Sequence, residues 1–170
     1  MIAVRRILAD EGSTLREVRL AALVDSPGAF GSTLERELTW RDDEWDDRAR
    51  RGAMSKDRAT WFAVDAETGE VAGIVGATHP DPAAPEVELV SMWTAPTARR
   101  RGVGRALIAA VLDWAQEGGA ESISLWVTRG NDAAEHLYRE MGFVETGDHQ
   151  TLPSDPCKDE LRMRHTLRDR

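Results

Sequence analysis

Cysteine, tyrosine and long apolar runs are scarce in this chain of 170 residues. Its single cysteine, Cys157, excludes an internal disulfide and cannot by itself build a thiolate metal site. None of the four histidines has metal-ligand spacing to another histidine or to the cysteine, so we expect no metal. No apolar run approaches the roughly 18 residues of a membrane span, and the opening residues lack a secretory pattern. We therefore expect a cytoplasmic protein without a membrane partner.

The charge balance is acidic, with a formal net charge of −8 at pH 7. Broad binding to nucleic acid needs a basic face that displaces phosphate counterions, so no nucleic-acid partner is expected. The 41% of hydrophobic and 31% of charged residues are typical of a globular protein, and the length fits a single domain over residues 1–170. The dense basic cluster Arg99-Arg100-Arg101 departs from this acidic balance, so its presence needs an explanation from the segment around it.

Hydrophobic periodicity predicts both strands and helices along the chain. Strands are expected at residues 3–8, 60–65, 70–78, 87–94, 122–127, 143–146 and 160–165. Helices are expected at residues 13–24, 33–51, 102–117 and 131–142, the last one starting with a capping box of Asp132 and Glu135. The order β-α-α-β-β-β-α-β-α-β-β indicates an α/β fold of the α+β kind, with a central mixed sheet flanked by helices.

The segment from Met92 to Gly104 is a strand that runs into a glycine-bearing loop and then opens a long helix. Free backbone N–H groups and the positive end of the dipole make a helix start a site for anions. Gly102 and Gly104 would let a phosphate reach the backbone, and the adjacent arginines would add charge-assisted hydrogen bonds. The predicted ligand is a phosphate or pyrophosphate. A plain solvated loop with a helix cap is the alternative.

Two other phosphate-binding loops fit this segment poorly. A P-loop needs lysine and then serine or threonine after its second glycine, whereas Arg105-Ala106 follows Gly104. A dinucleotide fingerprint needs a third small residue three positions after the second glycine, and Leu107 occupies that position.

Arg99-x-x-Gly102-x-Gly104 resembles the pyrophosphate signature of the GNAT superfamily of N-acetyltransferases. Residues 131–143 are similar to the same family's Asn-x-x-Ala-x-x-Leu-Tyr-x-x-x-Gly-Phe helix. Together the two motifs cover roughly residues 86–146. The resemblance implies a GNAT fold and an enzyme that uses acetyl-CoA as cosubstrate without a metal. Residues 86–146 would be the acetyl-CoA-binding core, and residues 1–58 would form mainly the acceptor side.

The resemblance also implies a set of cofactor-binding residues from the strand, the loop and the second helix. They are Met92, Trp93, Thr94, Arg99, Arg100, Arg101, Gly102, Val103, Gly104, Arg105, Asn131, Ala134 and Tyr138. Helix capping and packing are the alternative roles for Asn131 and Ala134. Strand alternation could also direct Trp93 toward an acceptor pocket.

Glu88 matches the general base of the family's histone-acetylating branch, which reaches the amine through water. Glu86 lies on the same face of the strand and is the substitute, and a salt-bridged strand carboxylate is the alternative reading. Tyr138 matches the general acid that protonates the departing thiolate, or is an amphipathic core residue. A main-chain N–H near residues 92–94 would hold the oxyanion.

The implied activity is direct transfer of acetyl to a primary amine of a small molecule or peptide, because Cys157 lies outside the motifs and leaves no nucleophile for an acyl-enzyme. A protein lysine or N-terminal acetyltransferase and a non-catalytic acyl-CoA sensor are the alternatives. Residues 20–33 are similar to those of a bacterial GNAT subgroup with poorly assigned substrates, and the family often forms homodimers. The acidic run at residues 42–47 could steer a cationic amine, or be a solvated helix face.

Overall fold

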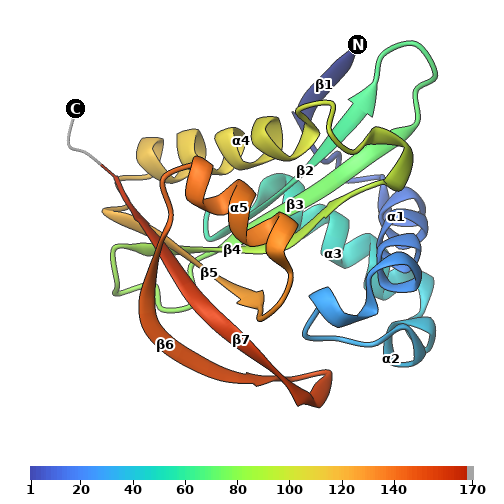
Figure 1. Ribbon diagram of the computed structural model, residues 1–170. Coiled ribbons are helices and arrows are strands. Elements are labelled where there is room, and N and C mark those ends of the chain that lie inside the picture. Colours follow the sequence, from blue (N-terminus) through green and yellow to red (C-terminus); the bar gives the residue numbers. More distant parts are fainter. Residues whose placement is uncertain (168–170) are drawn as a thin grey trace.

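A seven-stranded sheet forms the centre of the computed structural model, which describes residues 1–167 (Figure 1). The strand order is β1-β2-β3-β4-β5-β7-β6, and every neighbouring pair is antiparallel except β4 and β5, which run parallel. The strands are β1 (Ile2–Arg6), β2 (Arg58–Asp65), β3 (Val71–Thr78), β4 (Glu86–Thr94), β5 (Ser122–Thr128), β6 (Val144–Leu152) and β7 (Asp155–Thr166). The predicted mixed sheet is confirmed.

Helices cover both faces of this sheet. Helices α4 and α5 lie on one face, and α1 and α3 lie on the other (Figure 1). The helices are α1 (Gly12–Asp25), α2 (Leu34–Leu38), α3 (Asp42–Met54), α4 (Val103–Glu117) and α5 (Asp132–Glu140), with short 3-10 turns η1 (Pro27–Ala29) and η2 (Pro96–Ala98). Within residues 1–167, none of them combines the length and apolar composition needed to cross a bilayer.

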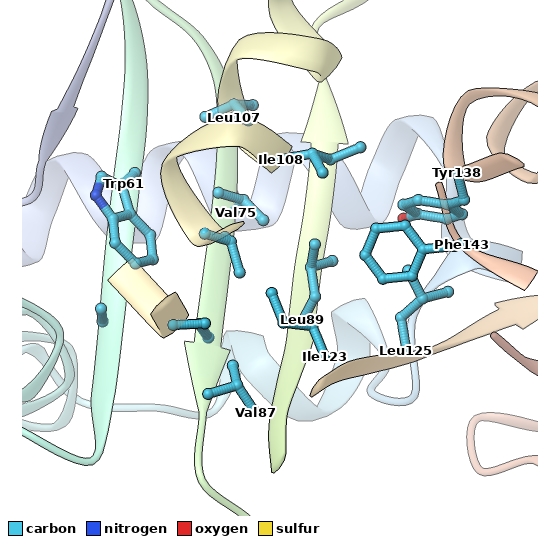
Figure 2. Packing of buried hydrophobic residues seen from close by; sticks show 14 of the residues in the cluster. Trp61, Val75, Val87, Leu89, Leu107, Ile108, Ile123, Leu125, Tyr138 and Phe143 are labelled. Carbon is cyan, nitrogen blue, oxygen red and sulfur yellow. The ribbon is translucent and has the colours of Figure 1, made fainter. Parts of the chain in front are cut away.

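Two apolar clusters result, one on each face. Because side chains alternate along a strand, Trp61 joins the cluster under α4 while its neighbour Phe62 joins the cluster under α1 and α3. Figure 2 shows the first cluster, in which Leu107 of α4 lies over the strands and Tyr138 lies beside Phe143. The second cluster contains the fully buried Trp45.

Strand β4 changes direction at a bulge. Val90 pairs with Gly76 and Trp93 with Ile74, so two residues of β4, Ser91 and Met92, lie opposite a single residue of β3. Ser91 adopts a φ of 56°, which is uncommon for a residue other than glycine. The extra residue reverses the side-chain alternation, so Trp93 packs in the second cluster, away from the face that Leu89 occupies.

The single helix predicted for residues 33–51 is wrong, because two helices occupy this segment. Helix α2 ends where the Thr39 hydroxyl donates to the Arg36 carbonyl at 2.7 Å. Helix α3 then starts afresh, with the Arg41 N–H donating to Glu44 Oε2 at 2.8 Å. A polar side chain that bonds the local backbone interrupts a helix without disturbing the hydrophobic pattern.

Strands β6 and β7 are much longer than the predicted strands at 143–146 and 160–165. Most residues of β6 are exposed, so the strand lacks the apolar alternation on which the prediction relied. The predicted capping box is also wrong at its first residue, because the N-cap of α5 is Asn131, whose side chain accepts from the Ala134 N–H at 3.3 Å.

Candidate active site

A cavity of about 930 Å³ lies where β4 and β5 separate. The two strands pair only over Glu86–Glu88 and residues 122–124, and beyond these pairs both strands line the cavity. The loop after β4, the start of α4 and one face of α5 complete its wall. A cavity of this size at the switch between parallel strands is typical of a ligand site in a mixed sheet.

The start of α4 presents free backbone donors to this cavity. Gly102 is the N-cap with a φ of 79°, and a Cβ at this position would have no neighbour within 4 Å. The N–H groups of residues 103–105 precede the first intrahelical bond, which Ala106 donates to the Gly102 carbonyl at 3.1 Å. Glycine is favoured at position 104 for a different reason: a Cβ there would lie 2.7 Å from Leu137 Cδ2 of α5. The loop therefore offers an open anion site.

The structure brings three of the four predicted arginines to the cavity. Arg99, Arg100 and Arg105 line it, whereas Arg101 lies outside and forms an ion pair with Asp65 at 3.6 Å. Arg99 is held by Asp25 and donates to the Thr94 carbonyl at 3.2 Å. The Arg100 side chain makes no hydrogen bond or ion pair within residues 1–167, which leaves its guanidinium available to an anion.

The bulge turns the side chain of Trp93 to the α1 and α3 face of the sheet. It is 8% exposed, and its indole Nε1 donates to Asp25 Oδ2 at 3.0 Å. The Asp25 carboxylate also accepts from the Ser26 hydroxyl at 2.7 Å. These hydrogen bonds lower the pKa of Asp25, so the group is a stable anion at neutral pH. Met92, Trp93 and Thr94 all line the cavity.

Helix α5 places Asn131, Ala134 and Tyr138 on the cavity wall. The Asn131 side chain is engaged as the helix cap, which is one of the two roles predicted for it. Tyr138 is 5% exposed and its ring packs edge-on against Phe143 with centroids 5.8 Å apart. Its hydroxyl makes no hydrogen bond within residues 1–167. Burial raises the pKa of Tyr138, so the phenol stays protonated and can donate.

Glu86 and Glu88 share a face of β4 but have different surroundings. Glu86 accepts from the hydroxyls of Ser122 and Ser124, each at 3.0 Å, and pairs with two arginines of β7, Arg162 and Arg164. Burial alone would raise the pKa of Glu86, but these hydroxyls and arginines lower it. Glu86 is therefore a fixed structural anion, and this disfavours it as the substitute base.

Glu88 differs from Glu86 because its pKa is raised, whereas that of Glu86 is lowered. It makes no hydrogen bond or ion pair within residues 1–167. Burial raises its pKa, and the neighbouring carboxylates of Glu160 and Glu86 act in the same direction against the opposing charge of Arg162. Glu88 does not line the 930 Å³ cavity itself, but Val90, two residues along the same face, does.

The family follows from the sequence match. Residues 23–143 match the model of the acetyltransferase (GNAT) family, which is more than half of the chain. The chain belongs to this family. The match includes the loop at residues 99–104 and the helix at 131–143, so the resemblance based on these two motifs is confirmed.

The relatives of this GNAT protein act on different acceptors. Streptothricin acetyltransferase of Streptomyces lavendulae is 32% identical over 114 residues, which cover 59% of this chain and 59% of that protein. The N-alpha-acetyltransferase RimI of Mycobacterium tuberculosis is 29% identical over 131 residues, with coverage of 76% and 80%. The chain thus spans less than two thirds of the streptothricin enzyme.

A solved structure supports the fold. The yncA protein of Salmonella typhimurium, solved with its cofactor acetyl-CoA, superposes with a TM-score of 0.80. The superposition covers 100% of this chain and 96% of that one at 16% identity, which shows the fold alone.

Sequence reasoning missed the contribution of the segment after α1 to this GNAT cavity. Ser26 and Ala29 line it, and the carbonyl of Gly28 accepts from the Thr128 hydroxyl at 2.7 Å. The sequence Asp25-Ser26-Pro27-Gly28 indicated only the end of a helix. Nothing in it revealed a contact with residues about a hundred positions later, because such pairing depends on the sheet order.

Proposed function

We propose that the protein is an acetyl-CoA-dependent N-acetyltransferase that transfers acetyl directly to a primary amine of a small molecule or peptide. The observation that carries this proposal is that one cavity joins the free N–H groups of α4, the bulge of β4 and the unpaired hydroxyl of Tyr138. Residues 86–146 would form the acetyl-CoA-binding core, and residues 1–58 would supply most of the acceptor side.

The residues of the cavity fit coenzyme A from one end to the other. The N–H groups of residues 103–105 and the guanidinium of Arg100 would bind the pyrophosphate. On the side facing β5, the backbone of β4 beyond Glu88 has no strand partner. The amide groups of the pantetheine arm would pair with these backbone groups as an added strand does.

The same residues supply the steps of acetyl transfer. Acetyl-CoA provides the thioester carbonyl that the amine attacks. Glu88 would take the proton of the amine through water, since burial raises its pKa and makes it a stronger proton acceptor than an exposed carboxylate. A main-chain N–H at residues 92–94 would stabilise the oxyanion, and Tyr138 would protonate the thiolate of coenzyme A. Cys157 is exposed and outside the cavity, which favours direct transfer.

We also propose a cytoplasmic protein of a bacterium. A free, exposed Cys157 suits a reducing compartment, and the streptothricin and RimI relatives are from bacteria. A homodimer would form through an edge of the sheet, where β1 and β6 each have one unpaired side.

The test is thiol release from acetyl-CoA by the purified protein over a panel of amines and peptides, with the acetylated product identified by mass spectrometry. Acetylation of small amines would support the proposal, and selective acetylation of protein lysines or protein N-termini would replace it with the protein-directed alternative. Saturable binding of acetyl-CoA without turnover of any acceptor would identify a sensor instead.

A further inference from the structure

A second cavity of about 700 Å³ lies between α2, α3 and the start of β2. Five arginines take part in its wall, an unusual density for a protein of net negative charge. They are Arg19, Arg36, Arg48, Arg51 and Arg58. None of them lines the 930 Å³ cavity.

The carboxylates near this second cavity are already engaged. Glu37 is 1% exposed and binds Arg19 through both oxygens, at distances of 2.9 to 3.1 Å. Asp47 pairs with Arg51 at 3.0 Å and with Arg50 at 3.6 Å. The acidic run of α3 is thus largely paired with arginines, including Asp43 with Arg41 and Asp42 with Arg16. This pairing disfavours the steering of a cationic amine that the run suggested.

Three arginines of the second cavity are not held by a short ion pair with a carboxylate. Arg48 approaches Glu37 only to 3.8 Å and packs its guanidinium over the ring of Trp40. Burial lowers the pKa of Arg48 to about 10, and the positive charges of neighbouring arginines add to this effect against the opposing charge of Glu37. The side chains of Arg36 and Arg58 make no hydrogen bond or ion pair within residues 1–167. Five arginines and four carboxylates line the cavity, so its wall has one positive charge in excess, and the unpaired guanidinium groups of Arg36 and Arg58 can bind an anion.

The register of the sheet places this charge beside the proposed reaction centre. Thr78 of β3 pairs with Arg58 on one side and with Glu88 on the other. All three lie on the α3 face, because their neighbours Ala59, Ala77 and Val87 belong to the cluster under α4. Two strand spacings separate the backbones of Arg58 and Glu88 by about 10 Å.

A hydrogen bond also links the walls of the two cavities. Arg19 Nη1 donates to the hydroxyl of Ser91 at 3.2 Å. Arg19 lines the second cavity, and Ser91, in the bulge of β4, lines the first. Glu88 lines neither cavity but lies on the same face of the sheet as Arg58, so an acceptor on the α3 face would have the arginines at one end and Glu88 at the other.

We propose that the acceptor is a small amino carboxylate, whose amine lies at Glu88 and the bulge while its carboxylate binds Arg58 and Arg48 in the second cavity. This inference rests on the proposed acetyltransferase function and names its substrate class. Arginine binds a carboxylate with two parallel hydrogen bonds, which would orient the amine toward the thioester. A polycationic amine would meet repulsion from the same arginines.

The experiment compares matched acceptors in the thiol-release assay. Amino acids of varied side chains are each tested beside the corresponding amide and the decarboxylated amine. The free acid of the preferred set should have a kcat/KM at least about 10-fold higher than its amide, because only the free acid carries the carboxylate that the arginines would bind. Arg58→Gln should raise KM for that acid by about 10- to 100-fold while leaving KM for the amide nearly unchanged.

Arg50→Gln is the matched control, since Arg50 lies on α3 but outside the second cavity, and it should leave both KM values unchanged. Equal or better use of amides or decarboxylated amines by the wild type would overturn the amino-carboxylate proposal and leave the acetyltransferase intact. An equal effect of Arg58→Gln on acid and amide would also overturn it. Binding of acetyl-CoA with no thiol release for any free acid counts against it as well. Absence of acetyl-CoA binding would instead refute the acetyltransferase function.

Discussion

Asp25 at the end of α1 accepts a hydrogen bond from the indole Nε1 of Trp93 in β4, with 3.0 Å between the two atoms. The same oxygen, Oδ2, also accepts from Arg99, the first residue of the glycine-bearing loop before α4. One carboxylate therefore joins the helix before the cavity, the strand that lines it and the loop that closes it. This arrangement fixes Arg99 beside the start of α4.

Asp25→Ala should lower the free energy of unfolding by about 1–3 kcal/mol, because the buried indole N–H of Trp93 loses its acceptor. Urea denaturation measures this change. Trp93→Phe should lower the free energy of unfolding less in the Asp25→Ala protein than in the wild type, since the acceptor of the indole N–H is already absent there. Purely additive effects of the two substitutions would contradict a direct Asp25–Trp93 interaction.

The stability that Asp25 provides should depend on pH in the acid range. Its pKa in the folded protein is lower than the value of about 3.9 in an unfolded chain. The contribution is therefore fully present above about pH 4 and is lost as the pH falls through the lowered folded pKa. The difference in unfolding free energy between wild type and Asp25→Ala should shrink below pH 4. A constant difference would contradict this.

Gly102→Val should abolish binding of acetyl-CoA by placing a side chain over the N–H groups of α4. Gly119, just beyond the other end of α4, is a matched control, because both glycines have a φ of 79° and open space around a Cβ. Both substitutions should cost about 1–2 kcal/mol of stability from the left-handed backbone. Calorimetric titration should show loss of binding for Gly102→Val alone. Equal binding by the two variants would contradict the placement of the pyrophosphate.

Tyr138→Phe should lower kcat by about 100-fold or more while leaving the Kd for acetyl-CoA nearly unchanged. The substitution removes the hydroxyl that has no partner within residues 1–167 but keeps the ring that packs on Phe143. Single-turnover kinetics together with a binding titration separate the two quantities. A parallel loss of affinity and turnover would assign Tyr138 to cofactor binding instead of proton donation.

Glu88→Gln should lower kcat/KM at neutral pH by about 100-fold and shift the half-maximal rate to higher pH. In the wild type the base must be ionised, so the rate falls as the pH drops through the raised pKa of Glu88. Glu86→Gln is the comparison. It should reduce stability through loss of the contacts with Arg162 and Arg164, but the fall of the rate at low pH should remain as in the wild type. An unchanged pH profile for Glu88→Gln would remove Glu88 as the base.

Much of the cofactor side of the protein could be predicted from its sequence. Alternation predicted β2 to β5, and the glycines of the loop predicted the start of α4 to within one residue. Local chemistry is sufficient there, because a free helix start and a positive φ depend on residues that are adjacent in the chain. The positions of Glu88 and Tyr138 on their elements followed from the same patterns.

The remaining features depend on contacts between distant residues. No residue pattern in the sequence indicates the bulge at Ser91. This bulge alone reverses the face of the sheet to which the Trp93 side chain points. Arg101 looked equivalent to its neighbours, yet only the fold brings it to Asp65. The second cavity could not be predicted from the sequence either, because Arg19, Arg48 and Arg58 come together only when α1, α3 and β2 pack.

Isothermal titration of the purified protein with acetyl-CoA tests the central claim most directly. The account predicts saturable binding with one site per chain, and a thermal stabilisation that grows with ligand concentration as binding to the folded state requires. Wild-type protein that is folded by urea denaturation but gives no binding heat and no stabilisation with acetyl-CoA would contradict the account.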